Sequence, residues 1–328
     1  MKHRRLLFIF AAVAAVITFA APFIGPDGFS LALMNDGSID VQIVRELRIP
    51  RVIAAFVAGV VLSLSGMAFQ ALFRNPLATP FTLGVSSGAS FGAALALNLG
   101  LTGALLGVSI PALAAFAGAL FSTGLVYGLT YLRSGFSTAT LLLAGVAVSF
   151  FFSSLILFVQ YTADVYNSFR MLRWVMGGLA VVDYDSIWTM LPFAAAGGVL
   201  LWLFRQELNL LLLGDDLATS RGVDVPRVKL VLFFTVSLMV GGVVAVCGPI
   251  GFVGMMVPHM CRMMVGHDHR VLTPASALFG GAFLVACDTA ARIVLAPAEL
   301  PVGVVTSLLG GPFFLWLLLS GSEQRNLA

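Results

Sequence analysis

The stretch RIPRVIAAFVAGVVLSLSGMAFQALFRNPLA, residues 48–78, contains the pattern that decides the fold. Its residues 52–73 are nearly all apolar or small, and about 20 such residues in a helix cross the hydrocarbon core of a membrane. Arg74, Asn75 and Pro76 follow directly. Because proline cannot continue the hydrogen-bond ladder and disfavours helical geometry in the residue before it, the run predicts a spanning helix that ends near Phe73.

Composition extends this prediction to the whole chain. Of its 328 residues 59% are hydrophobic and 10% charged, and the mean hydropathy is +1.02, whereas soluble domains are about 25% charged. A soluble enzyme or a nucleic-acid binder is therefore excluded. We expect an all-α integral membrane protein with about ten transmembrane helices in a single domain, residues 1–328. The predicted spans are residues 6–24, 52–73, 83–99, 103–132, 138–161, 187–204, 230–246, 252–265, 272–295 and 302–319.

Three of the connections between the predicted spans are expected to have structure or function of their own. Residues 162–184 suit a short interfacial helix, because Arg and Trp are frequent at the level of the headgroups. Residues 205–229 form the most polar internal stretch, and we expect a partner outside the bilayer to bind it. Pro249, Gly251 and Pro258 predict irregular backbone between the seventh and eighth spans, which is tolerated at membrane depth only beside protein or a water-filled cavity.

The distribution of basic residues predicts the orientation. With the N-terminus inside, twelve Lys and Arg residues fall on its side and six on the other, and cytoplasmic loops carry the excess of basic residues. Both termini are therefore predicted to be cytoplasmic. Residues 1–22 imitate a cleavable signal peptide, but the many spans after them favour a first membrane anchor.

The chain lacks the sequence motif with which many ATP-hydrolysing proteins bind phosphate. A phosphate-binding loop needs a lysine preceded by glycine, and the two lysines, Lys2 and Lys229, lack it. The chain is thus not expected to be an enzyme or to hydrolyse ATP itself. If ATP drives it, a separate nucleotide-binding subunit must bind residues 205–229.

Two other classes were weighed. An ion-coupled secondary transporter usually keeps ionisable residues near the midplane, where this chain has almost none; Asp288 and Arg292 are four apart and are expected to pair structurally, with external docking as the alternative. A membrane enzyme would have to use His259 or His267, and no metal site is expected from them. Neither alternative explains the polar stretch 205–229.

Motifs distributed along the chain resemble one family. In order they are RIPR (48–51), the segment 59–66 with Gln70, RNPLA (74–78), LGVSSGA (83–89), LLLAGV (141–146), MGG (176–178), GFVG (251–254), VPH (257–259) with Arg262, DHR (268–270) and ELPVGVV (299–305). Together they resemble the FecCD-type permeases of bacterial type II ABC importers, which take up ferric siderophores, haem or cobalamin.

The resemblance implies a cobalamin-importer-permease-like fold in the bacterial inner membrane. It implies pairing with a second permease subunit, as a homodimer or heterodimer, and with two ATP-binding subunits that hold ATP and Mg. A periplasmic binding protein would deliver the cargo, and this chain itself would bind no cofactor, metal or nucleic acid. Ferric siderophore is the first expectation for the cargo, with cobalamin or haem as alternatives.

The resemblance also implies roles for particular residues. The segment that couples to the ATPase corresponds to Gly214, Asp215, Asp216, Ala218, Arg221 and Gly222. The cytoplasmic gate corresponds to Asn75, Leu77, Ser137, Thr138 and Ala139, where Ala139 lacks the hydroxyl of a family variant. The contacts with the binding protein correspond to Arg48, Arg51 and Arg292.

Overall fold

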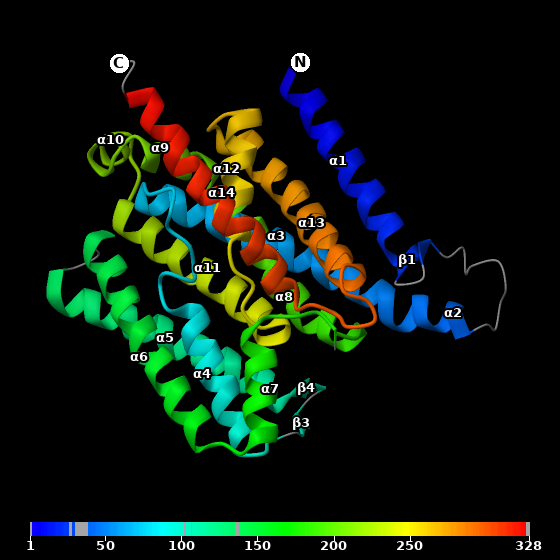
Figure 1. Ribbon diagram of the computed structural model, residues 1–328. Coiled ribbons are helices and arrows are strands. Elements are labelled where there is room, and N and C mark those ends of the chain that lie inside the picture. The colour runs from blue at the N-terminus through cyan, green and yellow to red at the C-terminus, as the bar shows by residue number, and fades with distance from the viewer. Residues whose placement is uncertain are drawn as a thin grey trace.

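The computed structural model describes residues 2–25, 28–29, 39–101, 103–105, 107–134, 138–180 and 182–325 and shows an almost entirely helical bundle (Figure 1). The long helices are α1 (Lys2–Ala20), α3 (Ile49–Phe73), α5 (Ile110–Ser134), α6 (Thr138–Thr162), α8 (Tyr184–Leu203), α11 (Val225–Cys247), α13 (His269–Ile293) and α14 (Val302–Arg325). The shorter ones are α2 (Ile39–Gln42), α4 (Val85–Asn98), α7 (Val165–Val175), α9 (Arg205–Leu212), α10 (Asp215–Ser220) and α12 (Val253–Val265). Two small antiparallel hairpins, β1 (Ile24–Gly25) with β2 (Gly28–Phe29) and β3 (Ala104–Leu105) with β4 (Val108–Ser109), complete these elements.

Seven helices in the described part of the chain are long and apolar enough to cross a membrane. The other three predicted spans correspond to helices with shorter described apolar runs: α4 with 14 residues, α12 with 13, and the segment Val302–Leu317 of α14. The multi-span helical class is confirmed, and the number of crossings stays a prediction for these three helices.

The segment before α3 falls between the first two predicted spans, and part of it is helical. Residues 39–48 are helical, as α2 and a π-helical turn, Ile43–Arg48, that runs straight into α3. The result is one apolar helix from Ile43 to Phe73. Val44 is buried while its neighbours Arg45 and Glu46 are exposed, so the charged residues lie on the outer face of an amphipathic helix end. This helical face was missed because its charges interrupt the apolar run.

The other connections have local causes. The interfacial helix predicted in 162–184 is α7, and residues 205–229 contain α9, α10 and the first turn of α11. Helix starts are capped by carboxylates that accept hydrogen bonds from backbone N–H groups of the first turn, at α7, α8, α11 and α13: Asp164, Asp183, Asp224 and Asp268. Gly248, with φ of 66°, ends α11 before the predicted irregular region.

The centre of the bundle is α3, which packs against α12 and α13 through paired glycines. A β-carbon on Gly59 would overlap the carbonyl of Gly280 on α13, and one on Gly66 would overlap the carbonyl of Gly254 on α12. Between helices in a bilayer no hydrophobic force acts, so close approach of backbones at small residues supplies the attraction. These contacts hold α3 directly against α12 and α13.

The two ends of the bundle differ in what they carry. The start of α1 and the end of α14 lie at the upper end of the bundle in Figure 1, together with α9, α10 and α12, whereas α2 and β1 lie at the right of the view. The described chain ends therefore share one end with the most polar internal segment. That this end faces the cytoplasm is the prediction from the basic residues.

The glycine contacts make a direct prediction. We expect Gly66→Ala to lower the free energy of unfolding by about 1–3 kcal/mol, because the new methyl group must push α3 away from α12. The measurement is thermal unfolding of the purified protein in detergent. Gly124→Ala on α5, where a β-carbon meets no atom within 4 Å, is the matched control and should leave stability unchanged or raise it by up to about 1 kcal/mol, because alanine favours a helix more than glycine does. Equal effects of the two variants would contradict this role for Gly66.

Candidate functional site

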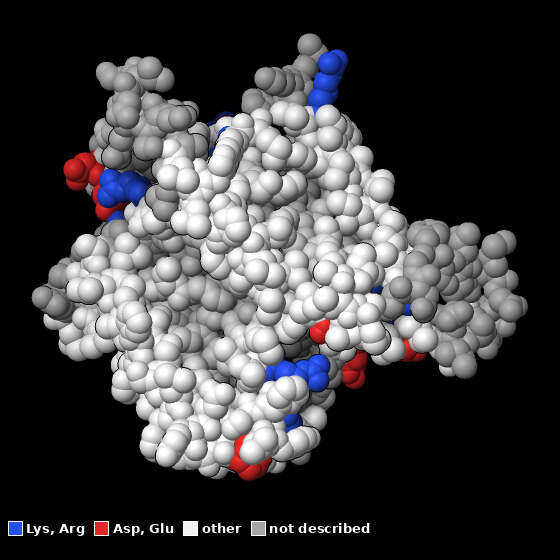
Figure 2. All heavy atoms as spheres, in the orientation of Figure 1, with Lys and Arg blue, Asp and Glu red and all other residues white. Residues whose placement is uncertain are grey.

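The segment predicted to couple to an ATPase is a short helical elbow. Gly214, with φ of 118°, separates α9 from α10, and Gly222, with φ of 86°, follows the end of α10. Ala218 is buried and holds α10 against the bundle, while Asp216 and Arg221 are exposed. Acidic and basic side chains gather on the surface over α10 (Figure 2). The predicted residues thus share one elbow, with their charged groups outward.

Asp215 is the exception among them, because it joins three elements. Its carboxylate accepts a hydrogen bond from Lys229 Nζ of α11 at 2.5 Å and lies 3.6 Å from a guanidinium nitrogen of Arg74, at the end of α3. The Lys229 side chain is only 4% exposed. The prediction of an exposed polar stretch up to Lys229 is wrong at this residue, since the first turn of α11 turns it inward onto Asp215. The elbow is therefore tied to the loop after α3.

A second tie fixes α9. Asn209 donates its amide hydrogen to Asp268 at 2.8 Å, and its Oδ1 accepts from the backbone N–H of His269 at 2.9 Å. The backbone N–H of Arg270, helped by the Asn209 amide, holds the pKa of Asp268 below its usual value. The segment around Asn209 gives no sign of this role, because the two partners of Asn209 lie about 60 residues further along the chain.

The predicted gate lies partly within the described chain. Arg74 adopts a left-handed conformation with φ of 48°, and Asn75 Oδ1 accepts a hydrogen bond from the backbone N–H of Leu77 at 2.9 Å. Asn75 and the exposed Leu77 thus form a tight turn directly after Arg74, whose guanidinium lies 3.6 Å from Asp215. Ser137 and the side chain of Thr138 lie outside the described residues, and Ala139 is exposed in the first turn of α6. Whether these two segments form one gate stays a prediction.

The opposite end of α3 holds a buried ion-pair cluster. Arg51 Nε lies 3.0 Å from both carboxylate oxygens of Asp288 on α13, and its Nη1 lies 2.7 Å from Glu299. Arg292 Nε lies 3.3 Å from Asp288, and its Nη2 donates to the carbonyl of Ala21. The pairing predicted between Asp288 and Arg292 is confirmed.

This cluster contains two of the three arginines that are expected to contact a binding protein. The side chains of Arg51 and Arg292 are only 9% and 5% exposed, so neither presents a free guanidinium to a binding protein. The acidic partners of Arg51 lie 237 and 248 positions further along the chain, so the segment around Arg51 gives no sign of its burial. Arg48 is half-buried and donates to the carbonyl of Pro22 at 3.3 Å. A contact of Arg48 with a binding protein stays a prediction.

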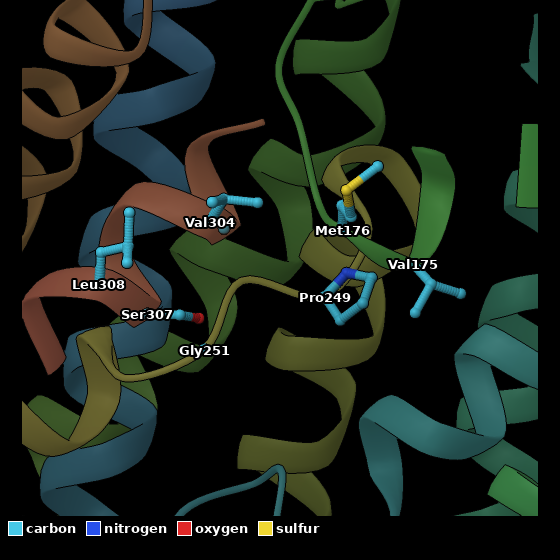
Figure 3. Close-up of a pocket in the computed structure, with 8 residues that line it drawn as sticks. Val175, Met176, Pro249, Gly251, Val304, Ser307 and Leu308 are labelled. Carbon is cyan, nitrogen blue, oxygen red and sulfur yellow. The ribbon is translucent and has the colours of Figure 1, made fainter. Parts of the chain in front are cut away.

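An apolar hollow of about 390 Å³ lies where α7 ends, the chain between α11 and α12 breaks, and α14 begins (Figure 3). Val304, Ser307 and Leu308 come from α14, and Val175 and Met176 lie across from them. Backbone hydrogen bonds close the junction, since Gly178 donates to Cys247 and Gly303 donates to Gly177. The predicted irregular backbone is confirmed at Pro249 and Gly251, which line the hollow, as such backbone must at membrane depth. The prediction is wrong at Pro258, which lies inside α12.

The described residues offer little for chemistry on a bound group. No cluster of three or more His, Cys, Asp or Glu among them could hold a metal ion. The three cysteines, Cys247, Cys261 and Cys287, are unpaired and buried. The arrangement combines an apolar hollow beside a break between helices with a charged elbow attached to the bundle's central helix.

Fold and sites together define a multi-span membrane permease. The chain belongs to the FecCD transport family, whose model matches residues 6–320, and this is a family of transport permease subunits. It is 44% identical over 280 residues to the cobalamin import system permease protein BtuC of Halobacterium salinarum, covering 84% of this chain and 73% of that one. It is 40% identical over 281 residues to the hemin transport system permease protein HmuU of Yersinia pestis, covering 85% and 84%.

A solved structure agrees over almost the full length. A metal-chelate type ABC transporter in an inward-facing conformation superposes with a TM-score of 0.88 at 28% identity, covering 97% of this chain and 99% of that chain. An ABC transporter permease protein of Bacillus subtilis, YvrB, is 38% identical over 294 residues, covering 89% of this chain and 83% of that one. The family resemblance seen in the sequence motifs is confirmed.

The buried cluster makes a testable prediction. Asp288→Asn leaves Arg51 and Arg292 without their shared buried carboxylate, and we expect a loss of about 3–5 kcal/mol of stability, as when one partner of a buried pair is removed. Glu299→Gln is the matched control, because Glu299 is 43% exposed and should cost at most about 1 kcal/mol. Thermal unfolding in detergent measures both. A larger loss for Glu299→Gln would show that Asp288 is not the centre of the cluster.

Proposed function

We propose that this chain is the permease subunit of an ATP-driven importer of metal chelates in the bacterial inner membrane. It would pair with a second permease subunit, two ATP-binding subunits that carry ATP and Mg, and a periplasmic binding protein. The observation that carries the proposal is the attachment of the elbow to α3 through Asp215, Lys229 and Arg74. A permease without its own ATPase site needs such a connection, because movements of a partner ATPase must be passed to its transmembrane helices.

The elbow offers a contact surface for the driving subunit. Leu213 and Leu217 are 64% and 55% exposed beside the charged side chains of α10. Apolar anchors surrounded by polar residues are typical of protein interfaces. A push on α10 would reach Asp215 first and then, through Arg74, the turn at Asn75 and Leu77. The proposed gate therefore lies next to the surface on α10 that the ATP-binding subunit would contact.

The hollow at the start of α14 suits a cargo that must pass without being held. Ser307 supplies the only polar side chain among its lining residues, and conduction requires binding weak enough for release. The relatives named for cobalamin and for hemin, both 40% or more identical, support those two chelates. Ferric siderophore, the first expectation from the motifs, lacks such named support and ranks behind them.

Uptake tests the proposal directly. The chain is co-purified with the ATP-binding subunit and binding protein encoded beside it and reconstituted in liposomes with labelled hemin, cobalamin or ferric siderophore. We expect uptake of one chelate that requires ATP. Uptake driven by an ion gradient without ATP would overturn the proposal in favour of a secondary transporter.

A variant in the elbow separates coupling from folding. Leu217→Asp should weaken capture of the ATP-binding subunit at least about tenfold, because an interface anchor contributes 2 kcal/mol or more. Its thermal stability should stay near that of the parent, since Leu217 is exposed. Arg227→Gln, in the neighbouring exposed pair with Asp224, is the control and should leave capture unchanged. Normal capture by Leu217→Asp would exclude α10 as the contact.

A further inference from the structure

A second hollow, of about 420 Å³, lies at the end of the bundle that carries α9 and α10. The end of α3, the last turns of α12 and the end of α9 surround it. Two guanidinium groups, two imidazoles and two side-chain amides line it, and no carboxylate does. Its lining residues are Gln70, Arg74, Asn75, Pro76, Leu212, His259, Arg262, Met263 and His267.

Arg262 is a partly buried cation whose side-chain partner is a neutral amide rather than a carboxylate. It is half-buried, and its guanidinium donates to the neutral Oε1 of Gln70. Gln70 is itself fixed, because its amide donates to the carbonyl of Gly254 at 3.2 Å. No carboxylate lies within ion-pair distance of Arg262 among the residues described.

The position of Arg262 in the helix offsets only part of its charge. It lies in the last turn of α12, where the helix dipole favours a cation with the equivalent of about half a negative charge at the terminus. Partial burial costs a guanidinium part of its hydration free energy. A hydrogen bond to a neutral amide and the helix dipole together make up for only part of that cost. An anion in the adjoining hollow would supply the negative charge that Arg262 lacks.

Arg74 adds a second positive charge on the other side of the hollow. The one carboxylate near it, Asp215, already accepts a hydrogen bond from Lys229 and lies 3.6 Å from Arg74. One acidic group thus serves two cations. The other nearby carboxylate, Asp268, is occupied by Asn209 and the backbone of Arg270.

The rim of the hollow indicates what kind of anion fits. Met263 and Met264 beside it are 66% and 42% exposed. His259 packs edge-on against Phe313 of α14, which in turn contacts the exposed Trp316. An exposed apolar wall with an aromatic side chain therefore adjoins the cationic hollow. Aromatic rings of this kind sit at the headgroup level of membranes.

We propose that this hollow binds the phosphate headgroup of an anionic phospholipid between Arg262 and Arg74, with the acyl chains against the adjoining apolar wall. Arginine suits this role because its planar fork matches phosphate oxygens, and basic pockets between membrane helices bind anionic headgroups. Free phosphate shares the headgroup chemistry but would gain nothing from the wall. The site is independent of which chelate the permease carries.

The test uses the full chain in nanodiscs of phosphatidylcholine with or without phosphatidylglycerol. Native mass spectrometry of the released protein should show retained phosphatidylglycerol, and Arg262→Gln should reduce that retention at least about tenfold. Arg270→Gln is the control, because Arg270 is exposed at the same end and does not line the hollow. Arg262→Lys, which keeps the charge, covers the case in which Arg262→Gln does not fold and should retain an intermediate amount.

Three results would overturn the proposal. Equal retention of phosphatidylglycerol by the parent and both Arg262 variants would show that the hollow is not the site. Stabilisation by inorganic phosphate, without preference for phosphatidylglycerol, would show a soluble anion instead of a lipid. Loss of ATP-binding-subunit capture in Arg262→Gln, with lipid retention unchanged, would show that a carboxylate of that subunit is the partner of Arg262.

Discussion

Close contact between helix backbones is the interaction on which the rest of this structure depends. Lipid chains are as apolar as leucine, so helices gain little by burying side chains against each other and must gain by packing. Gly59 and Gly66 let α3 touch α13 and α12 at their carbonyl groups. Once α3 is held in this way, its two ends become fixed points for the charged groups around them.

The charged groups divide between those two ends. Arg51 near the start of α3 enters the buried cluster with Asp288, and Arg74 directly after α3 lies beside Asp215 on the elbow. A single continuous helix, Ile43–Phe73, therefore connects the buried ion-pair cluster at Arg51 with the partly exposed pair of Arg74 and Asp215. Ionisable groups are expensive inside a membrane, which explains why each cluster is found at a helix end and is closed by paired groups.

Much of the fold and part of the site could be predicted from the chain itself. The apolar runs predicted the helices, and Pro249 and Gly251 marked the broken region, because these signals are local. The coupling segment at Gly214 was expected from the family resemblance. The inward turn of Lys229 and the burial of Arg51 could not be predicted. Each depends on a carboxylate contributed by another helix, and spacing along one helix says nothing about its neighbours.

The sequence by itself determined that this chain is a multi-span membrane permease of the FecCD family without its own phosphate-binding loop. Length, hydropathy and ordered motifs carry that information, because a spanning helix satisfies its own backbone hydrogen bonds and can be recognised alone. Only the tertiary structure decided which arginines are free and which are paired. Arg51 pairs with a residue 237 positions away, and Arg262 keeps an open hollow instead of a carboxylate. Packing between helices, which no single segment encodes, made that difference.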